Sequence, residues 1–311
     1  MTTALFTHSS GLKHVTPPGH PERVERLAAI HAVLDQDAFA GLDRREAGLA
    51  DRAEVLRCHP EDYLARVEAA MPADGWTSLD ADTHLSPGSL EAALRGVGGC
   101  VAAVDAVIAG EVANAFVAMR PPGHHAETAT AMGFCLFGNV AIAAKRALDH
   151  HGLSRVAVVD FDVHHGNGTQ DLLWNEARVR FASTHQMPLY PGSGASHEVG
   201  AHGQITNVAL PPGSGGAEMR AAYDRVIIPM LEDFAPEMIL ISAGFDAAAA
   251  DPLANLNWTT EDFAWVTGRI CDVADAHSGG RVVSTLEGGY DLDALAEGVA
   301  AHVQVLMERG G

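Results

Sequence analysis

The chain carries little positive charge. Lysine and arginine make up 20 of its 311 residues, against 40 aspartate and glutamate residues, so the formal net charge is −20. The only lysines are Lys13 and Lys145. A protein that binds nucleic acid directly needs a basic stripe that displaces counterions from phosphates, so we expect no such partner. Cationic substrates would be attracted instead, although acidity that serves only solubility would give the same composition.

Long apolar runs and paired cysteines are also missing. No stretch of about 18 apolar residues occurs, and the segment Met1–His8 lacks the basic and apolar regions of a secretory signal. We therefore expect no membrane association and a cytoplasmic location. The four cysteines are scattered, which argues against a thiolate zinc site or a disulfide framework. The length and the 47% hydrophobic content suit one large core, and we expect a single domain over residues 1–311.

The most informative segment that is present joins an apolar run to carboxylates and imidazoles. Its sequence is Asp160-Phe161-Asp162-Val163-His164-His165-Gly166-Asn167-Gly168. Because side chains alternate between the faces of an extended strand, we expect Asp160, Asp162 and His164 to project to one side and to converge. A strand end decorated with polar residues could explain one Asp and one His, but is a poor explanation of two of each. The spacing therefore predicts a metal site.

Three further clusters follow apolar runs in the same way. They are Arg120-Pro121-Pro122-Gly123-His124-His125, Ile241-Ser242-Ala243-Gly244-Phe245-Asp246 and Leu286-Glu287-Gly288-Gly289-Tyr290. The Pro-Pro-Gly sequence prevents regular pairing and fixes the loop before the two histidines. A pair of histidines alone would more often be a solvated loop feature, but four such strand ends in one chain favour a shared site.

Short aliphatic runs alternate with longer amphipathic segments. We expect strands near 114–119, 155–161, 179–183, 205–210, 237–243 and 281–286, and helices near 21–35, 60–70, 89–109, 138–151, 217–234, 260–276 and 291–308. This alternation is typical of an α/β protein with a parallel sheet. Runs without polar alternation, such as 156–159 and 238–241, predict central strands covered by helices on both faces. Ligands of such sheets bind beyond the carboxyl ends of the strands, where every cluster falls.

At this point the chain resembles the histone deacetylase superfamily, which includes bacterial histone-deacetylase-like and acetylpolyamine amidohydrolases. Besides the three strand-end clusters and the Asp160–Gly168 segment, the resemblance rests on Gly19-His20-Pro21-Glu22 and Gly133-Phe134-Cys135, and it spans nearly the whole chain. It implies an α/β arginase/deacetylase fold with a mostly parallel sheet of about eight strands. It also implies a hydrolase that removes acetyl groups from acetylated amines.

The resemblance implies that Asp162, His164 and Asp246 hold a catalytic metal ion. Three nitrogen or oxygen ligands with an open position are typical of catalytic zinc, whereas structural zinc sites close the shell with four ligands. Zinc is the expected metal, although ferrous iron or manganese would also accept this ligand set. A structural potassium ion is implied as well, held by the carbonyls of Asp160, Asp162, His164 and Thr184 and by the Ser183 hydroxyl.

The resemblance also assigns the catalytic groups. His125 is expected to act as general base and then as acid toward the leaving amine, His124 to tune the electrostatics, and Tyr290 to donate to the oxyanion. Asp160 is expected to pair with His124, and Asn167 with His125. Several relatives carry Asp in place of Asn167, and a neutral amide stabilises an imidazolium less than a carboxylate does. The chain therefore resembles the class II branch.

Substrate-binding positions follow from the same resemblance. Phe134 and Tyr190 are expected to flank the methylenes of the substrate, with Gly133 offering its carbonyl to the amide. Some polyamine-selective relatives carry a Glu at Leu253, so acetyl-lysine is the favoured substrate and an acetylated polyamine the alternative. Arg26 matches a basic residue near the metal, whereas Val24 replaces the usual proline. An arginase-type ureohydrolase and a non-catalytic metal-binding module are the other readings. Retention of both His125 and Tyr290 argues against the module.

Overall fold

The computed structural model describes all 311 residues, which form one eight-stranded sheet flanked by helices. Its strands lie in the order β2-β1-β5-β10-β9-β6-β7-β8, and every neighbouring pair is parallel. The strands are β1 (Thr3–Thr7), β2 (Asp43–Glu46), β5 (Asn114–Val117), β6 (Val156–Asp160), β7 (Val179–Gln186), β8 (Ile205–Leu210), β9 (Met238–Ala243) and β10 (Val282–Leu286). A separate two-stranded hairpin is formed by β3 (Thr77–Ser78) and β4 (His84–Leu85).

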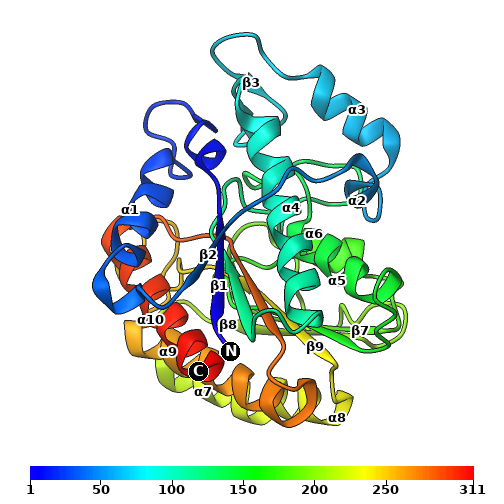
Figure 1. The fold of residues 1–311 in the computed structure, drawn as a ribbon, viewed down its shortest axis with the longest axis vertical. Coiled ribbons are helices and arrows are strands. Elements are labelled where there is room, and N and C mark those ends of the chain that lie inside the picture. Colours follow the sequence, from blue (N-terminus) through cyan, green and yellow to red (C-terminus); the bar gives the residue numbers. More distant parts are fainter.

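Helices cover both faces of the sheet (Figure 1). The α-helices are α1 (Val24–Leu34), α2 (Arg52–Val55), α3 (Glu61–Ala69), α4 (Ser89–Ile108), α5 (Asn139–Asp149), α6 (Asn167–Leu172), α7 (Gly216–Ala222), α8 (Ile228–Phe234), α9 (Thr260–Val273) and α10 (Leu292–Gly310). Figure 1 shows α1, α9 and α10 on one side of the sheet and α4 and α5 on the other. None of the helices has both the length and the hydropathy that crossing a membrane requires.

The central strands are apolar on both faces because each face packs against helices. In β6, Ala157 and Val159 join the core on the side of α9 and α10, whereas Val156 and Val158 join the core on the side of α4 and α5. The same division holds along β9. Burial on two faces removes the need for polar alternation, which is why the continuous apolar runs mark the centre of the sheet.

The predicted α/β class and the parallel eight-stranded sheet are confirmed. Six of the eight strands lie where the sequence places them, within a few residues at their ends. Residues 217–234 form α7 and α8 joined by a π-helical turn, Tyr223–Ile227, rather than one continuous helix. Strands β1 and β2 were not predicted. The reason is plain for β2, which is an edge strand of four charged residues, Asp43–Glu46, and edge strands commonly carry charge.

One buried histidine makes the stability of the core depend on pH. His302 of α10 is fully buried, and its Nδ1 donates to Thr267 Oγ1 (2.7 Å) while its Nε2 accepts from Ser284 Oγ (2.8 Å). Both ring nitrogens are thus satisfied in the neutral form. Burial lowers the pKa of His302 from its ordinary value of 6.5 to about 3.

Acidification should therefore destabilise the protein through His302. Below pH 6.5 the unfolded chain binds a proton that the folded chain does not, so this group lowers the free energy of unfolding by up to about 1.4 kcal/mol per pH unit. The loss begins near the unfolded pKa and levels off near the folded one. A His302→Gln variant should show a shallower fall between about pH 7 and pH 5 in denaturant titrations. The exposed His197→Gln variant is the control, and equal slopes for His302→Gln and wild type would contradict the account.

Candidate active site

The polar clusters lie together at one edge of the sheet. Strands β5, β6, β9 and β10 are neighbours or near neighbours and run parallel, so their carboxyl ends reach the same edge (Figure 1). Each of the four strands is followed by one of the clusters that the sequence singles out. The sheet therefore brings together segments that are far apart in the chain, as expected for an open parallel sheet.

Three buried side chains of types that bind metal ions converge at this edge. We call Asp162, His164 and Asp246 the ligand group. The donor atoms of Asp162, His164 and Asp246 all lie within 4.8 Å of one another. His164 Nδ1 is 3.1 Å from Asp162 Oδ1 and 3.1 Å from Asp246 Oδ2. The other oxygen of each carboxylate is held by the backbone, since Gly288 N donates to Asp162 Oδ2 (2.8 Å) and Val163 N donates to Asp246 Oδ1 (2.9 Å).

The strand alternation that we expected over residues 160–164 does not continue beyond Asp160, and this expectation was wrong. Strand β6 ends at that residue, and residues 161–166 form a loop. Asp162 and His164 do meet, but their third partner is Asp246 from the end of β9 rather than Asp160. Asp160 instead accepts a hydrogen bond from His124 Nδ1 (3.0 Å). A loop can aim side chains that a regular strand would separate, and sequence spacing alone does not distinguish the two cases.

The charges of this group call for a cation. Burial lowers the pKa of His164, but hydrogen bonds with Asp162 and Asp246 outweigh burial and raise it to about 10. Burial and the charge of Asp162 raise the pKa of Asp246. Two buried carboxylates in contact therefore require positive charge between them, either a proton or a metal ion. Two carboxylates and one imidazole form a donor set that suits zinc and other divalent ions, so the residues present fit a metal.

Backbone glycines keep this space open. A Cβ at Gly244 would collide with the Asp162 carboxylate, and a Cβ at Gly288 would collide with the carboxylates of Asp246 and Asp162. Both positions therefore need the smallest residue for close approach rather than for an unusual φ. Packing therefore explains the Gly of the Ala-Gly-Phe-Asp segment and the first Gly of the Glu-Gly-Gly-Tyr segment.

Two histidines beside the ligand group occupy different electrostatic environments. His124 Nε2 lies 3.8 Å from Asp162 Oδ2. Burial lowers the pKa of His124, but the charges of Asp162 and Asp160 outweigh burial and raise it well above its usual value. The pKa of His125 is instead lowered well below its usual value by burial and then by the positive charges of His124 and His164. His125 is therefore the neutral imidazole of the pair, and its Nδ1 donates to Asn167 Oδ1 (2.7 Å).

A buried glutamate holds the histidine loop to the sheet. Glu287, at the end of β10, accepts hydrogen bonds from the backbone N–H groups of Gly123 (2.7 Å) and His124 (3.1 Å). Its other oxygen accepts from Ser242 Oγ (3.0 Å) at the end of β9. One side chain thus fixes the position of the histidines relative to two central strands.

Tyr290 is held by contacts on both sides of its backbone. Asp251 Oδ2 accepts from Tyr290 N (2.7 Å). Arg26 donates to the carbonyls of Glu287 and Gly289 (both 2.6 Å), and its guanidinium carbon lies 4.9 Å from the centre of the Tyr290 ring. Tyr290 is only 8% exposed. Burial raises the pKa of the phenol well above its usual value, which keeps its hydroxyl a donor.

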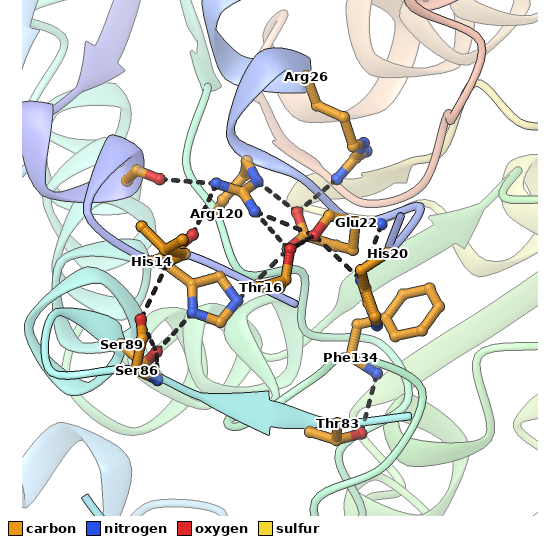
Figure 2. Close-up of polar contacts among 12 residues, drawn as sticks. His14, Thr16, His20, Glu22, Arg26, Thr83, Ser86, Ser89, Arg120 and Phe134 are labelled. Carbon is orange, nitrogen blue, oxygen red and sulfur yellow. Dashed lines mark hydrogen bonds and ion pairs between the residues drawn. The ribbon is translucent and has the colours of Figure 1, made fainter. Parts of the chain in front are cut away.

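A buried network of ion pairs holds the Arg26 side chain in place. Figure 2 shows Glu22 between Arg120 and Arg26. Arg120 Nη2 donates to Glu22 Oε2 (2.6 Å), and Arg26 Nη1 donates to Glu22 Oε1 (3.0 Å). His14 Nε2 lies 3.4 Å from the same carboxylate. Burial raises the pKa of Glu22, but Arg120, His14 and Arg26 together lower it well below its usual value. The His-Pro-Glu motif thus contributes a structural anion rather than a metal ligand.

His164 also lines a cavity of about 240 Å³. The residues that line it are Asp82, His125, Gly133, Phe134, His164, Leu189, Tyr190, Leu253 and Tyr290. The rings of Phe134 and Tyr290 lie 5.8 Å apart, and those of Tyr190 and His125 lie 5.2 Å apart, each pair edge to face. Tyr190 is 39% exposed and forms part of the mouth. All four expected substrate-binding residues therefore line one opening that leads to His125.

Two neighbouring segments hold Phe134 in place at the wall of the cavity. Phe134 has a φ of 69°, which is unusual for a residue with a side chain. Its N–H donates to Thr83 Oγ1 (3.1 Å), and its ring packs edge to face against His20 at 4.7 Å (Figure 2). These contacts hold the backbone in a conformation that the local sequence would not favour.

Sequence reasoning missed several residues that build the site. Glu287 and Glu22 belong to the motifs quoted from the sequence, but neither had been given a role. Leu189 and Asp82 line the cavity from segments without a motif. A buried-looking acid in a quoted motif was an available signal for the two glutamates. No comparable signal existed for Leu189 or Asp82, whose position depends on how their loops fold.

Comparisons with known proteins identify this arrangement. Residues 20–306 match the family model described as the histone deacetylase domain. A probable deacetylase from Archaeoglobus fulgidus is 40% identical over 299 residues, covering 94% of this chain and 82% of the relative. The histone deacetylase-like amidohydrolase of Pseudomonas aeruginosa is 42% identical over 284 residues, covering 89% of this chain and 74% of the relative.

A solved structure gives the same result for the fold. The crystal structure of the HDA15 HD domain superposes with a TM-score of 0.93 at 33% sequence identity, and the match covers 99% of this chain and 89% of that one. Because the family model spans most of the chain and both relatives are well above 30% identical over most of their length, the relationship extends beyond the fold. The chain belongs to the histone deacetylase family, the deacetylase and amidohydrolase enzymes that its sequence resembles.

Proposed function

We propose that this protein is a zinc-dependent deacetylase that hydrolyses acetylated amines, with acetyl-lysine side chains as its substrates. The observation that carries the proposal is the convergence of Asp162, His164 and Asp246 next to a cavity that is lined by His164, His125 and Tyr290. Asp162, His164 and Asp246 would hold the metal. When bound, a divalent ion supplies Lewis acidity, which lowers the pKa of water and polarises a carbonyl oxygen.

His125 is the group placed to move protons. Its Nδ1 is committed to Asn167, so Nε2 is the atom available to accept a proton from the attacking water and to return it to the leaving amine. The lowered pKa of His125 keeps the ring neutral and able to accept. His124 shares its own Nδ1–H with Asp160 and keeps a positive charge beside it. We therefore assign proton transfer to His125 and electrostatic support to His124 and Asp160.

Tyr290 is the hydrogen-bond donor placed to stabilise the acetyl oxygen. Its raised pKa keeps the phenol protonated, and the ring lines the cavity together with His125. Arg26 and Asp251 hold the backbone on either side of the ring, so the hydroxyl needs little reorganisation during the reaction. Donors that are fixed in advance are the ones that contribute most where charge develops.

Tyr290→Phe should lower kcat steeply and leave KM nearly unchanged. The hydroxyl is needed chiefly where negative charge develops, and loss of one oxyanion donor costs roughly 10²–10³ in rate. Steady-state kinetics on an acetyl-lysine peptide would measure both constants. If the variant raised KM with kcat intact, Tyr290 would be a wall of the substrate channel rather than the oxyanion donor.

The lining of the cavity bears on the substrate. Phe134, Leu189, Tyr190 and Leu253 present apolar surface that suits the methylene chain of acetyl-lysine. Asp82 at the same cavity favours the second candidate, an acetylated polyamine, whose remote ammonium it could pair with. A competition assay with an acetyl-lysine peptide and an acetylated polyamine separates the two. We expect the larger kcat/KM for the peptide, and a clear preference for the polyamine would replace it as the substrate.

Two further parts of the proposal concern binding and location. Asp160 and Ser183 are register partners on β6 and β7, which supports a structural potassium ion held by the carbonyls of Asp160, Asp162, His164 and Thr184 with the Ser183 hydroxyl. Thermal stability in potassium and in sodium buffers would test this site.

We also propose that the protein acts in the cytoplasm and does not bind nucleic acid directly.

A further inference from the structure

One acidic side chain beside the proposed base has no role in the mechanism above. Asn167, the first residue of α6, lies between His125 and Glu127. Its Oδ1 accepts from His125 Nδ1 (2.7 Å), and its Nδ2 donates to Glu127 Oε1 (2.8 Å). Nδ2 also approaches Met132 Sδ at 3.4 Å. His125, Asn167 and Glu127 thus form a continuous chain of hydrogen bonds that begins at the ring expected to transfer protons.

Glu127 is held in place independently of Asn167. Its N–H donates to the carbonyl of Thr130 (3.0 Å), which closes a tight turn over residues 127–130. The next residue, Thr128, donates through its N–H (2.8 Å) and its hydroxyl (2.6 Å) to Asp171 on the following turn of α6. The turn is therefore fixed against the helix at two points, and Glu127 presents its carboxylate to Asn167 from a defined position.

The chemistry of an amide gives this contact a consequence. The oxygen and nitrogen of an Asn side chain are nearly equal in shape, so its hydrogen-bond partners decide which end faces which neighbour. An ionised carboxylate only accepts, and Glu127 must therefore take the NH2 end of Asn167. The oxygen end is left for His125, whose Nδ1 must then carry the proton. Nε2 keeps its lone pair, as a base requires.

We propose that Glu127 is a positioning residue that sets the tautomer of His125 through Asn167. The inference rests on the proposed function only in that His125 is taken to be the proton acceptor. If the amide turned over, its NH2 would face Nδ1, the imidazole proton would move to Nε2, and the ring could no longer accept a proton from water. Glu127 thus provides in two steps the orientation that a carboxylate in place of Asn167 would provide directly.

Glu127→Ala tests the role by kinetics. A wrong tautomer at a catalytic histidine costs up to about 10⁴ in kcat. Without Glu127 the Asn167 amide would be flipped in only a fraction of the molecules. We therefore expect kcat to fall by roughly 10–10², with KM changed by less than about twofold. Glu127→Gln should recover most of the loss, since its carbonyl oxygen still accepts from Asn167. Glu232→Ala, an exposed glutamate on α8, is the matched control. Unchanged kcat in Glu127→Ala would overturn the inference.

A charge-exchange cycle separates orientation from a structural role. In Asn167→Asp the new carboxylate can itself accept from His125 Nδ1, but it also faces the Glu127 carboxylate, and repulsion between the two should displace them and lower kcat. Combined with Glu127→Gln, the introduced amide can donate to the introduced carboxylate, so the double variant should be more active than Asn167→Asp alone. A coupling of this sign is expected for residues in contact or in one hydrogen-bond network, and not for distant, independent ones. Additive effects of the two changes would contradict the chain of hydrogen bonds.

The tautomer can also be observed without turnover. In metal-free protein with 15N-labelled histidine, the imidazole nitrogens of His125 report which of them is protonated, with the signals assigned by their loss in His125→Phe. Wild type and Glu127→Gln should show the proton on Nδ1, and Glu127→Ala a mixture with Nε2. Wild type with the proton on Nε2 would overturn the inference. Absence of deacetylase activity in wild type would instead count against the proposed function, because this spectrum does not depend on activity.

Discussion

Asp246→Ala should leave the protein folded but without its catalytic ion and without measurable deacetylation. Asp246 is one of only three side chains in the ligand group. Loss of even an outer partner of a metal ligand costs about 10–100-fold in metal affinity or activity, so loss of a direct ligand should cost at least about 100-fold. Metal content by elemental analysis and turnover on an acetyl-lysine peptide measure the two effects.

Two companion variants make the Asp246 result specific. Asp246→Asn keeps an oxygen for the Val163 N–H but removes the charge, so it should also lose the metal while preserving the backbone contact. Asp233→Ala, an exposed aspartate on α8, should keep both metal and activity. Retention of a full equivalent of zinc by Asp246→Ala would show that the ion binds elsewhere.

His125→Ala should lose turnover while it keeps the metal. His125 lies beside the ligand group but is not part of it. General acid or base catalysis contributes roughly 10²–10⁴-fold, and kcat should fall by at least the lower of these values at the pH optimum. Zinc content should match that of wild type.

His124→Ala is the informative comparison for His125. His124 contacts Asp160 and Asp162. Because we propose that it acts through charge rather than by proton transfer, its loss should disturb metal binding and the pH dependence as well as kcat. A His125→Ala protein that holds its metal and keeps full activity would remove His125 from the mechanism. A loss confined to His124→Ala would transfer the role of base to that residue.

The sequence predicted the sheet because burial on both faces leaves a strong signal. Strands such as Val156–Asp160 and Met238–Ala243 are continuous apolar runs between amphipathic helices, and they lie at the centre of the sheet. Strand β2 gave no such signal, since Asp43–Glu46 is a charged edge strand whose place depends on its neighbour β1. Short segments at the border of a sheet are determined by tertiary pairing more than by their own pattern.

The sequence predicted which residues form the site better than it predicted how they are arranged. The residues expected to bind metal and to line the channel lie together, and the pairs His124 with Asp160 and His125 with Asn167 are present. The direction of Asp160 was misjudged because the strand ends there. Contacts such as Glu287 to the histidine loop and Glu127 to Asn167 join residues through loops, and loop conformation is the part of a fold that residue patterns specify least.

The most direct test of the account is hydrolysis of an acetyl-lysine peptide by protein stripped of metal and then titrated with zinc, with released acetate as the readout. The account predicts no activity in the stripped protein, recovery that is complete at about one ion per chain, and loss of the recovered activity on addition of a chelating hydroxamate. Full activity in the metal-free protein would contradict it, as would a zinc-loaded protein that hydrolyses neither the peptide nor an acetylated polyamine.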